Sequence, residues 1–336
     1  MKLRDGDWPL FGWTDDMRPV LSRARQTGRP VALATIVALA GSAPRQPGTQ
    51  MVFEGAEATG HFSGGCIEED IANHAVEVVR TGEPALLHYG SNGPWIDIRL
   101  ACGAGMEILV ERIDPDDPGI ARLLELAAQR LRAISHSDGY CRTVEAYGGE
   151  QCRSFGREPL RLTLSHDPPW RLIVIGGDPA ALAIAQLATQ SGFATTILRP
   201  GGPQSPAPIA GAAYRNGDAL AALEALVPDR WTAIAIALHE SEMEHDLLRS
   251  LLASDAGYVG LMGAERRAST VRRRLERDGL ERSRIQRLRA PMGAVRCGKS
   301  SWEIAVSVVA EIMEVRATAQ LRIFVASEPV RRELCQ

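Results

Sequence analysis

The sequence predicts an α/β protein of two domains, the first of mixed α+β structure and the second built on a doubly wound parallel sheet. Three observations support this prediction. The chain has 336 residues, whereas one globular domain usually has roughly 100–200. Its first half contains short strand-like segments separated by glycine and proline, and its second half alternates apolar strands with helices. A polar stretch with two consecutive prolines, residues 165–170, lies between the halves. We therefore expect domains over residues 1–165 and 170–336.

Composition and charge exclude several classes of protein. Apolar residues make up 45% of the chain and charged residues 24%, which excludes disordered, collagen-like and coiled-coil proteins. The formal net charge of −3 does not favour nucleic acid or an anionic membrane as a partner. The longest apolar run, residues 31–40, is too short for a membrane-spanning helix, and the N-terminus has no secretory pattern. We expect a cytoplasmic protein, in which the six cysteines form no disulfide framework.

Hydrophobic spacing and turn residues predict the elements of the first domain. We expect strands over 31–39, 51–53, 84–89, 95–101 and 106–112, and helices over 67–80 and about 117–133. The loop over 41–48 contains two prolines and two glycines. The sequence around Gly148-Gly149 predicts a hairpin turn that joins strands over 141–147 and 150–155.

In the second domain, apolar runs of strand length alternate with helical patterns. We expect strands over 171–175, 193–198, 233–238 and 257–261, and helices over 179–191, 219–227, 241–253, 264–278 and 301–315. This alternation is typical of a parallel sheet with helices on both faces.

The segment Ser63-Gly64-Gly65-Cys66 carries the main candidate site of the first domain. It brings the chain to a cysteine at the start of the predicted helix, and Glu68 follows directly. The N–H groups at a helix N-terminus suit an anion such as phosphate, and the same field favours the thiolate form of a cysteine. Cys66 is therefore a candidate metal ligand, sulfur carrier or nucleophile. The alternative is a small buried residue in a tight turn.

Two further loops of the first domain offer polar groups. Cys102-Gly103 lies in a second glycine- and cysteine-containing loop, which suggests two loops that meet around one ligand; alone, it would be a strand-to-strand turn. Ser42 and Arg45 offer a hydroxyl and a guanidinium, and arginine suits bidentate contact with phosphate or carboxylate. The alternative for this loop is a proline turn with a solvated arginine.

The second domain has a divergent nucleotide-binding pattern. Gly176-Gly177 follows its first strand, where a dinucleotide-binding loop would lie, but Asp178 replaces the second glycine of that pattern. The next strand ends at Arg199 rather than at an acidic residue, and an arginine there suits the 2′-phosphate of NADP. His239 follows the third core strand and is a candidate ligand contact or a structural histidine.

The segment over residues 265–289 contains ten arginines against four acidic residues. One interpretation is a solvated helix face with ion pairs, each of modest energy. The other is a patch that binds a partner or a nucleotide phosphate.

Several motifs in a fixed order resemble one protein family. In the first domain they are Gly41-Ser42-x-Pro44-Arg45, Gly48-x-x-Met51-Val52, Gly60, Ser63-Gly64-Gly65-Cys66-Ile67-Glu68 and Cys102-Gly103. In the second they are Tyr258 to Gly263 with Arg266-Arg267, Ala290-Pro291-Met292-Gly293, Glu303 to Ser307 and Ala310-Glu311-Ile312. Together they resemble the XdhC/CoxI family, accessory proteins of xanthine dehydrogenase and related molybdenum hydroxylases. The resemblance spans roughly residues 30–316.

The resemblance implies a fold and a function. It implies an N-terminal domain with the Gly-Gly-Cys motif and a Rossmann-like C-terminal domain. It implies a non-enzymatic protein that binds molybdenum cofactor, as molybdopterin or its cytidine dinucleotide form, supports its sulfuration and inserts it into an apo molybdenum hydroxylase. Cys66 would contact the molybdenum or its sulfur, with Cys102 nearby. The other residues implied at the cofactor are Ser42, Arg45, Ser63, Gly64, Gly65, Glu68, Gly103, Gly176, Gly177, His239 and Gly263. A homodimer and a cysteine desulfurase partner are further expectations.

The second domain departs from the family pattern at three places. Residues 176–179 replace the family's Gly-Ala-Gly-His, Arg199 replaces an acidic residue, and residues 294–297 replace Leu-Asp-Ile-Gly. Two other functions therefore stay open. One is an NAD(P)-dependent oxidoreductase that uses the second domain, and the other is a structural scaffold for hydroxylase assembly.

Overall fold

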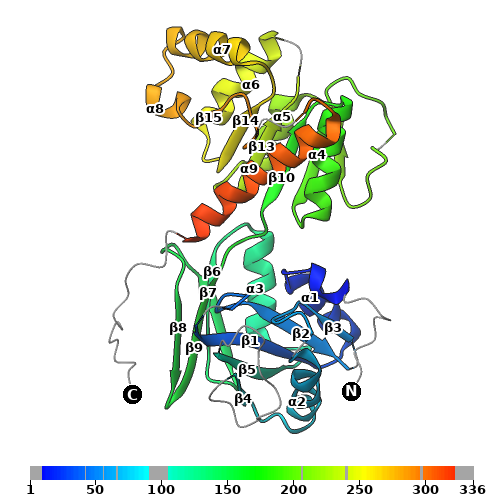
Figure 1. Cartoon of the computed structure of the whole chain (residues 1–336), viewed down its shortest axis with the longest axis vertical. Coiled ribbons are helices and arrows are strands. Elements are labelled where there is room, and N and C mark those ends of the chain that lie inside the picture. The colour runs from blue at the N-terminus through cyan, green and yellow to red at the C-terminus, as the bar shows by residue number, and fades with distance from the viewer. Residues whose placement is uncertain are drawn as a thin grey trace. The chain divides into compact units, whose positions relative to one another are not determined.

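The computed structural model describes residues 10–41, 43–55, 57–65, 67–90, 105–205, 207–238, 241–295 and 298–321. The chain divides into two compact units, Met1–Pro168 and Pro169–Gln336 (Figure 1). Each unit has its own sheet and its own hydrophobic core.

A five-stranded antiparallel sheet forms the centre of the first unit. Its strands follow the order β3-β2-β1-β5-β4. Alternate residues of β1 face opposite sides of the sheet. Ala32 and Ile36 pack with the apolar face of α2, whereas Val31 and Leu33 pack with α1 and α3. The elements are η1 (Leu10–Trp13), α1 (Arg18–Thr27), β1 (Val31–Ala40), β2 (Gln50–Glu54), β3 (Glu57–Thr59), α2 (Glu68–Thr81), β4 (Ala85–Tyr89), β5 (Gly105–Ile113) and α3 (Pro118–Ala128).

A four-stranded antiparallel sheet completes the first unit. It contains β6 (Ala133–Ser137), β7 (Arg142–Ala146), β8 (Arg153–Arg157) and β9 (Leu160–His166), in the order β7-β6-β9-β8. The prediction of a hairpin at Gly148-Gly149 is therefore wrong, because β7 and β8 lie at opposite edges of this sheet. β7 pairs with β6, and β8 pairs with β9, so the segment between β7 and β8 crosses from one edge to the other.

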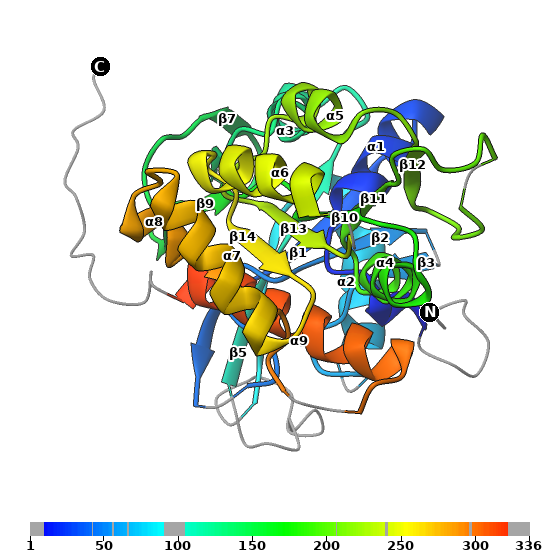
Figure 2. The same cartoon turned by 90° about the horizontal axis from the view of Figure 1, so that it is seen from above.

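The second unit is a Rossmann-like doubly wound sheet. Six parallel strands follow the order β12-β11-β10-β13-β14-β15. Helices α4 and α9 pack on one face of this sheet, and α5, α6, α7 and α8 pack on the other (Figure 2). The elements are β10 (Arg171–Ile175), α4 (Pro179–Gln190), β11 (Ala194–Leu198), β12 (Ala213–Arg215), α5 (Ala219–Leu226), β13 (Thr232–Ile236), α6 (Ser241–Ala253), β14 (Tyr258–Leu261), α7 (Glu265–Arg277), α8 (Arg282–Ile285), β15 (Leu288–Arg289) and α9 (Ser301–Leu321).

The observed elements confirm the predicted fold class, and most predicted elements lie within two or three residues of their expected bounds. The helix expected over 117–133 ends earlier, at Ala128, because Arg130 adopts a φ of 58° and Ala133 starts β6. Leu131 continues the helical spacing but is 45% exposed. The strand expected over 95–101 lies outside the described residues. Among the helices in the described part of the chain, none combines the length and apolar character required to cross a membrane.

Candidate functional site

Three loops that carry predicted site residues adjoin strand ends at the same end of the five-stranded sheet. β1 ends at Ala40 opposite Gly105, where β5 begins, and β4 ends at Tyr89 in the next register position. The first residue of β2 and the last residue of β3 also lie toward this end of the sheet. The segments that adjoin these strand ends are residues 41–49, 60–67 and 90–104, of which 42, 66 and 91–104 lie outside the described residues. The strand ends therefore lie at one end of the sheet, and the prediction that the glycine-rich loops form one site stays a prediction.

Some predicted site residues lie outside the described part of the chain. They are Ser42, Cys66, Cys102, Gly103 and His239. Their predicted roles stay predictions. The neighbours of Cys66 on both sides are described, however, so the backbone that leads into and out of this cysteine can be examined.

The Glu68 carboxylate organises the loop before α2. Its Oε1 accepts the N–H groups of Phe62, Ser63 and Gly64 at 2.9, 2.7 and 3.0 Å. Its Oε2 accepts the N–H groups of Gly65 and Ile67 at 2.9 and 3.2 Å and the Ser63 hydroxyl at 2.7 Å. A single carboxylate thus occupies the position in which a bound anion would neutralise these donors.

The environment of Glu68 keeps its carboxylate ionised. The residue is only 1% exposed, and burial alone would raise its pKa. Hydrogen bonds from the Ser63 hydroxyl and from the N–H groups of Ser63 and Phe62 outweigh burial and lower the pKa of Glu68 from 4.5 to about 2. The predicted role of Glu68 as a cofactor contact therefore has a competing description, in which its carboxylate holds the loop.

Gly64 and Gly65 present bare backbone to the outside of this loop. Their φ angles are 85° and 121°, which side chains rarely adopt. A Cβ atom at either position would meet nothing within 4 Å, and both residues are exposed. Their N–H groups point inward to Glu68, so a ligand at the outer face would contact the Cα atoms and peptide planes. A phosphate held by these two N–H groups would have to displace Glu68.

A polar chain that the sequence analysis missed lies beside this loop. Tyr89, at the end of β4 and 4% exposed, donates a hydrogen bond of 2.6 Å from its Oη to Asp70 Oδ2 in the first turn of α2. His74 Nε2 lies 3.8 Å from the same oxygen. Burial, and then the Asp70 carboxylate, raise the pKa of Tyr89 far above its usual range, so its hydroxyl stays protonated. The spacing of Asp70 and His74, one helical turn apart, is the only sequence signal for this cluster.

Arg45 is paired within the first unit. Its Nη2 forms a short ion pair with Asp15 Oδ1, and its Nε is buried without a hydrogen-bond partner among the described residues. The prediction that Arg45 holds an anionic group of a ligand stays a prediction. Such a ligand would compete with Asp15 for this guanidinium.

The predicted nucleotide loop of the second unit is built as a helix start. Gly176 has a φ of 143°, and a Cβ there would lie 2.5 Å from the Ala237 carbonyl oxygen, so only glycine fits. Asp178 accepts the Ala181 N–H at 2.7 Å and caps α4. The methylenes of Arg199 lie so close to Gly177 that a Cβ there would be 2.3 Å from Arg199 Cδ. The Asp178 carboxylate thus accepts the Ala181 N–H, one of the backbone donors at the helix start that would otherwise face a pyrophosphate.

Gly263 lies at the carboxyl edge of the parallel sheet, next to a fixed arginine. Arg267 donates to the Leu238 carbonyl at 2.9 Å and to the Met262 carbonyl at 3.3 Å, and it forms a short ion pair with Glu244. This arginine therefore joins the ends of β13 and β14 to α6. Gly263 leaves room for its methylenes, because a Cβ there would lie 3.0 Å from Arg267 Cδ.

The late motifs of the second domain meet in one hydrogen-bond network. Glu311 on α9 accepts the Tyr258 hydroxyl and the Gly293 N–H on its Oε2, both at 2.7 Å. Ser307 Oγ accepts the Val295 N–H at 3.1 Å and donates to the Val295 carbonyl at 2.6 Å. These motif residues therefore hold the loop after Pro291 against α9, which is a structural role.

A pattern missed by the sequence analysis precedes α9. Gly293, Gly298, Lys299 and Ser300 have the spacing of a phosphate-binding loop, G-x-x-x-x-G-K-S. In the structure, however, the Glu303 carboxylate accepts the Ser300 N–H at 3.0 Å and the Ser300 hydroxyl at 2.7 Å, and the Glu303 N–H donates to Ser300 Oγ at 3.4 Å. This reciprocal capping box closes the start of α9. The pattern therefore describes a helix cap here.

The described residues contain no group of three or more histidine, cysteine, aspartate or glutamate side chains that could hold a metal ion. Cys66 and Cys102, the predicted metal ligands, lie outside these residues.

Two family models match the chain. The model of the XdhC and CoxI family matches residues 24–90, which include the Glu68 loop. The model of the XdhC Rossmann domain matches residues 172–312, which include nearly all of the parallel sheet.

Individual proteins resemble nearly the whole chain. PaoD, a molybdenum cofactor insertion chaperone of Escherichia coli (strain K12), is 26% identical over 311 residues, which cover 90% of each chain. A protein of Bacillus subtilis (strain 168), named as a probable subunit of xanthine dehydrogenase, is 24% identical over 84% of this chain and 92% of its own. A crystal structure described as a xanthine dehydrogenase from Bacillus halodurans has the same fold, with a TM-score of 0.71 and 21% identity over 90% of this chain and 96% of the other.

Proposed function

Because the chain belongs to the XdhC and CoxI family, we propose that it is a maturation factor that binds molybdenum cofactor and inserts it into a molybdenum hydroxylase. The similarity to a molybdenum cofactor insertion chaperone over 90% of both chains supports this proposal. The cofactor is then the cargo of this protein, and the hydroxylase is its partner.

One structural observation carries the proposal: the backbone on both sides of Cys66 is fixed by a single buried carboxylate. Gly65 and Ile67 both donate their N–H groups to Glu68. A thiolate between them would be presented beside exposed glycines that have open space above them. A soft thiolate is a suitable ligand for molybdenum or its sulfur. Cys66 is therefore the residue we assign to cargo binding.

The Glu68 loop has space for this cargo, but its backbone N–H groups are already hydrogen-bonded. The open face at Gly64 and Gly65 leaves room for a flat pterin next to the backbone. The N–H groups of this loop are already bonded to Glu68, so an anionic part of the cargo needs another cation. Arg45 is the candidate in the neighbouring loop, after exchange of its partner Asp15.

Finer features belong to the same proposal. We assign Cys102 to a position near Cys66, because its loop leaves the same edge of the sheet. Sulfuration of the cofactor while it is bound would require a sulfur donor, for which a cysteine desulfurase is the expected partner. The expected cargo is molybdopterin or its cytidine dinucleotide form, and a homodimer is the expected assembly.

Cofactor retention tests the proposal directly. The full-length protein is purified from a host that makes molybdenum cofactor, and bound pterin and molybdenum are quantified after release. We expect wild-type protein to carry both and Cys66→Ala to lose most of each. Cys141→Ala is the matched control, because Cys141 is an exposed free cysteine of the same unit. Wild-type protein without pterin, or equal retention by the two variants, would contradict the proposal.

The oxidoreductase alternative has its own test. Asp178 caps α4 at the place where that function needs an open pyrophosphate site. Titration with NADPH, with Arg199→Gln as the variant, decides whether the second unit binds this nucleotide. Saturable binding that depends on Arg199 would revive the alternative.

A further inference from the structure

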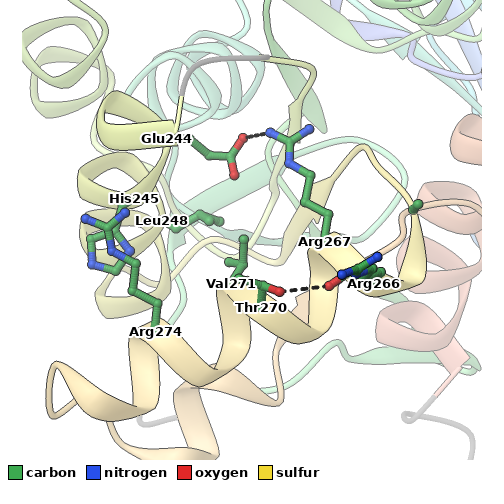
Figure 3. Close-up of a pocket in the computed structure, with 9 residues that line it drawn as sticks. Glu244, His245, Leu248, Arg266, Arg267, Thr270, Val271 and Arg274 are labelled. Carbon is green, nitrogen blue, oxygen red and sulfur yellow. Dashed lines mark hydrogen bonds and ion pairs between the residues drawn. The ribbon is translucent and has the colours of Figure 1, made fainter.

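A pocket between α6 and α7 adjoins the Arg267–Glu244 contact described beside Gly263, and no ligand has been assigned to it above. It has a volume of about 480 Å³, within the roughly 300–1,000 Å³ typical of small-molecule sites. Its lining residues are Glu244, His245 and Leu248 from α6 and Ala264, Arg266, Arg267, Thr270, Val271 and Arg274 from the start of α7 onward (Figure 3). All of them belong to the described part of the second unit.

The floor of this pocket is apolar. Leu248 is fully buried, and Val271 faces it from α7 (Figure 3). The walls are held by polar contacts between the two helices. Glu244, which is 2% exposed, pairs with Arg267, and His245 Nε2 lies 2.7 Å from Asp278 Oδ2. These two contacts join α6 to α7 and its C-terminal end beside the cavity.

The charge of the pocket is strongly positive. Three guanidinium groups line it, and Glu244 neutralises only that of Arg267. Arg266 and Arg274 are exposed, and neither guanidinium has a hydrogen-bond or ion-pair partner among the described residues. Figure 3 shows Arg266 at one end of the pocket and Arg274 at the other, beside His245. These two guanidinium groups, which pair with no side chain of the described residues, therefore flank the apolar floor.

We propose that this pocket binds a small organic anion that carries phosphate or carboxylate groups. The planar guanidinium matches both groups through paired hydrogen bonds. Arg266 and Arg274 would hold the anionic groups, while Leu248 and Val271 would contact the carbon skeleton. The volume of the pocket fits a small molecule, and Arg267 connects one end of the pocket to the carboxyl ends of β13 and β14. Ligands of doubly wound sheets bind at this edge.

Calorimetric titration of the full-length protein tests this inference. The probes are inorganic phosphate, adenosine monophosphate and citrate, each at low ionic strength. We expect at least one organic probe to bind saturably with a Kd below about 1 mM. We expect the double variant Arg266→Gln/Arg274→Gln to weaken this binding at least about tenfold. Comparison of the monophosphate with citrate distinguishes phosphate from carboxylate as the preferred group.

Two controls make the outcome decisive. Arg273→Gln changes an exposed arginine of the same helix that does not line the pocket, and it should change the Kd less than about twofold. Thr270→Trp fills the cavity and should abolish binding without removing any charge. The proposal is overturned if no organic probe binds or if the double variant binds like wild type. Cys66→Ala should leave this binding unchanged, so the pocket and the cofactor proposal fail independently.

Discussion

Replacement of Glu68 by glutamine should release the loop that presents Cys66. The variant Glu68→Gln has the same shape but no charge, and its amide NH₂ group would face N–H donors that need an acceptor. The pKa of Glu68 is lowered from 4.5 to about 2, and this difference corresponds to roughly 3 kcal/mol. We expect the loop to lose stabilisation of this order. The glutamine oxygen is a weaker, uncharged acceptor, and the glutamine NH₂ group repels the N–H donors that faced the other carboxylate oxygen among these six hydrogen bonds.

Hydrogen exchange measures this loss locally. The amides of Phe62, Ser63, Gly64, Gly65 and Ile67 are bonded to Glu68, although Gly64 and Gly65 are exposed to solvent. We expect these amides to be protected in wild-type protein and to exchange roughly 100-fold faster in Glu68→Gln, since each 1.4 kcal/mol is a factor of ten. Mass spectrometry of the peptide that covers residues 60–72 gives the rate.

The neighbouring carboxylate provides a matched control. Glu69 is exposed and accepts none of these loop hydrogen bonds, so Glu69→Gln should leave the exchange rates unchanged. Equal exchange in the two variants would refute the assignment of Glu68 as the organiser of the loop. The lowered pKa of Glu68 also determines the pH dependence of the loop's stability. The stabilisation by the carboxylate is complete above pH 4.5 and is lost as the pH falls toward 2, where the carboxylate becomes protonated.

Three other substitutions test features of the first unit. Gly65→Ala should destabilise the loop by about 1–3 kcal/mol, because the φ of 121° is strained for any side chain, and faster exchange of the same peptide would report it. Tyr89→Phe should lower the free energy of unfolding by about 1–3 kcal/mol in urea titrations, because Asp70 loses its buried donor. His166→Gln should flatten the stability profile between pH 6.5 and 4. Burial, together with the charges of Arg18 and Arg142, lowers the pKa of His166 to about 4, so the unfolded state alone takes up a proton in this range and wild-type stability falls by roughly 3 kcal/mol.

Each of these has an outcome that would contradict it. Gly148→Ala, at a glycine without positive φ and with open space around its Cα, should be neutral; equal effects of the two glycine variants would remove the strain argument. A Tyr89→Phe variant as stable as wild type would show that Asp70 finds another donor. An unchanged pH profile in His166→Gln would assign that titration to other groups.

Local patterns in the sequence were enough to predict four of the six strands of the parallel sheet, but not the short edge strands β12 and β15. The four predicted strands are short apolar runs, and β10, β13 and β14 are each followed by a helix of 12 or 13 residues whose spacing is visible in the sequence. The four-stranded sheet was harder, because the choice of strand partner is not a local property. Gly148-Gly149 has turn chemistry, yet β7 and β8 pair with strands that lie before and after that turn.

The sequence predicted the residues of the candidate site but not the hydrogen bonds that fix their loop. The glycines and Glu68 were identified as one motif, and the structure places them in one loop. The sequence could not show that the carboxylate folds back on the loop that precedes it. A capping box has its glutamate at the third helical position, whereas Glu68 is the first residue of α2, so no known spacing indicated this arrangement. The Tyr89 contact joins residues from two elements and had no pattern either.

Under the proposed delivery function, the internal carboxylate at Glu68 has a consequence for the release of the cofactor. A loop that becomes ordered only when it binds a cofactor loses conformational entropy on binding and regains it on release. Here the shape is set in advance by the chain itself, so neither step involves a large ordering cost. Hand-over to a recipient then depends on which of the two partners makes the better direct contacts.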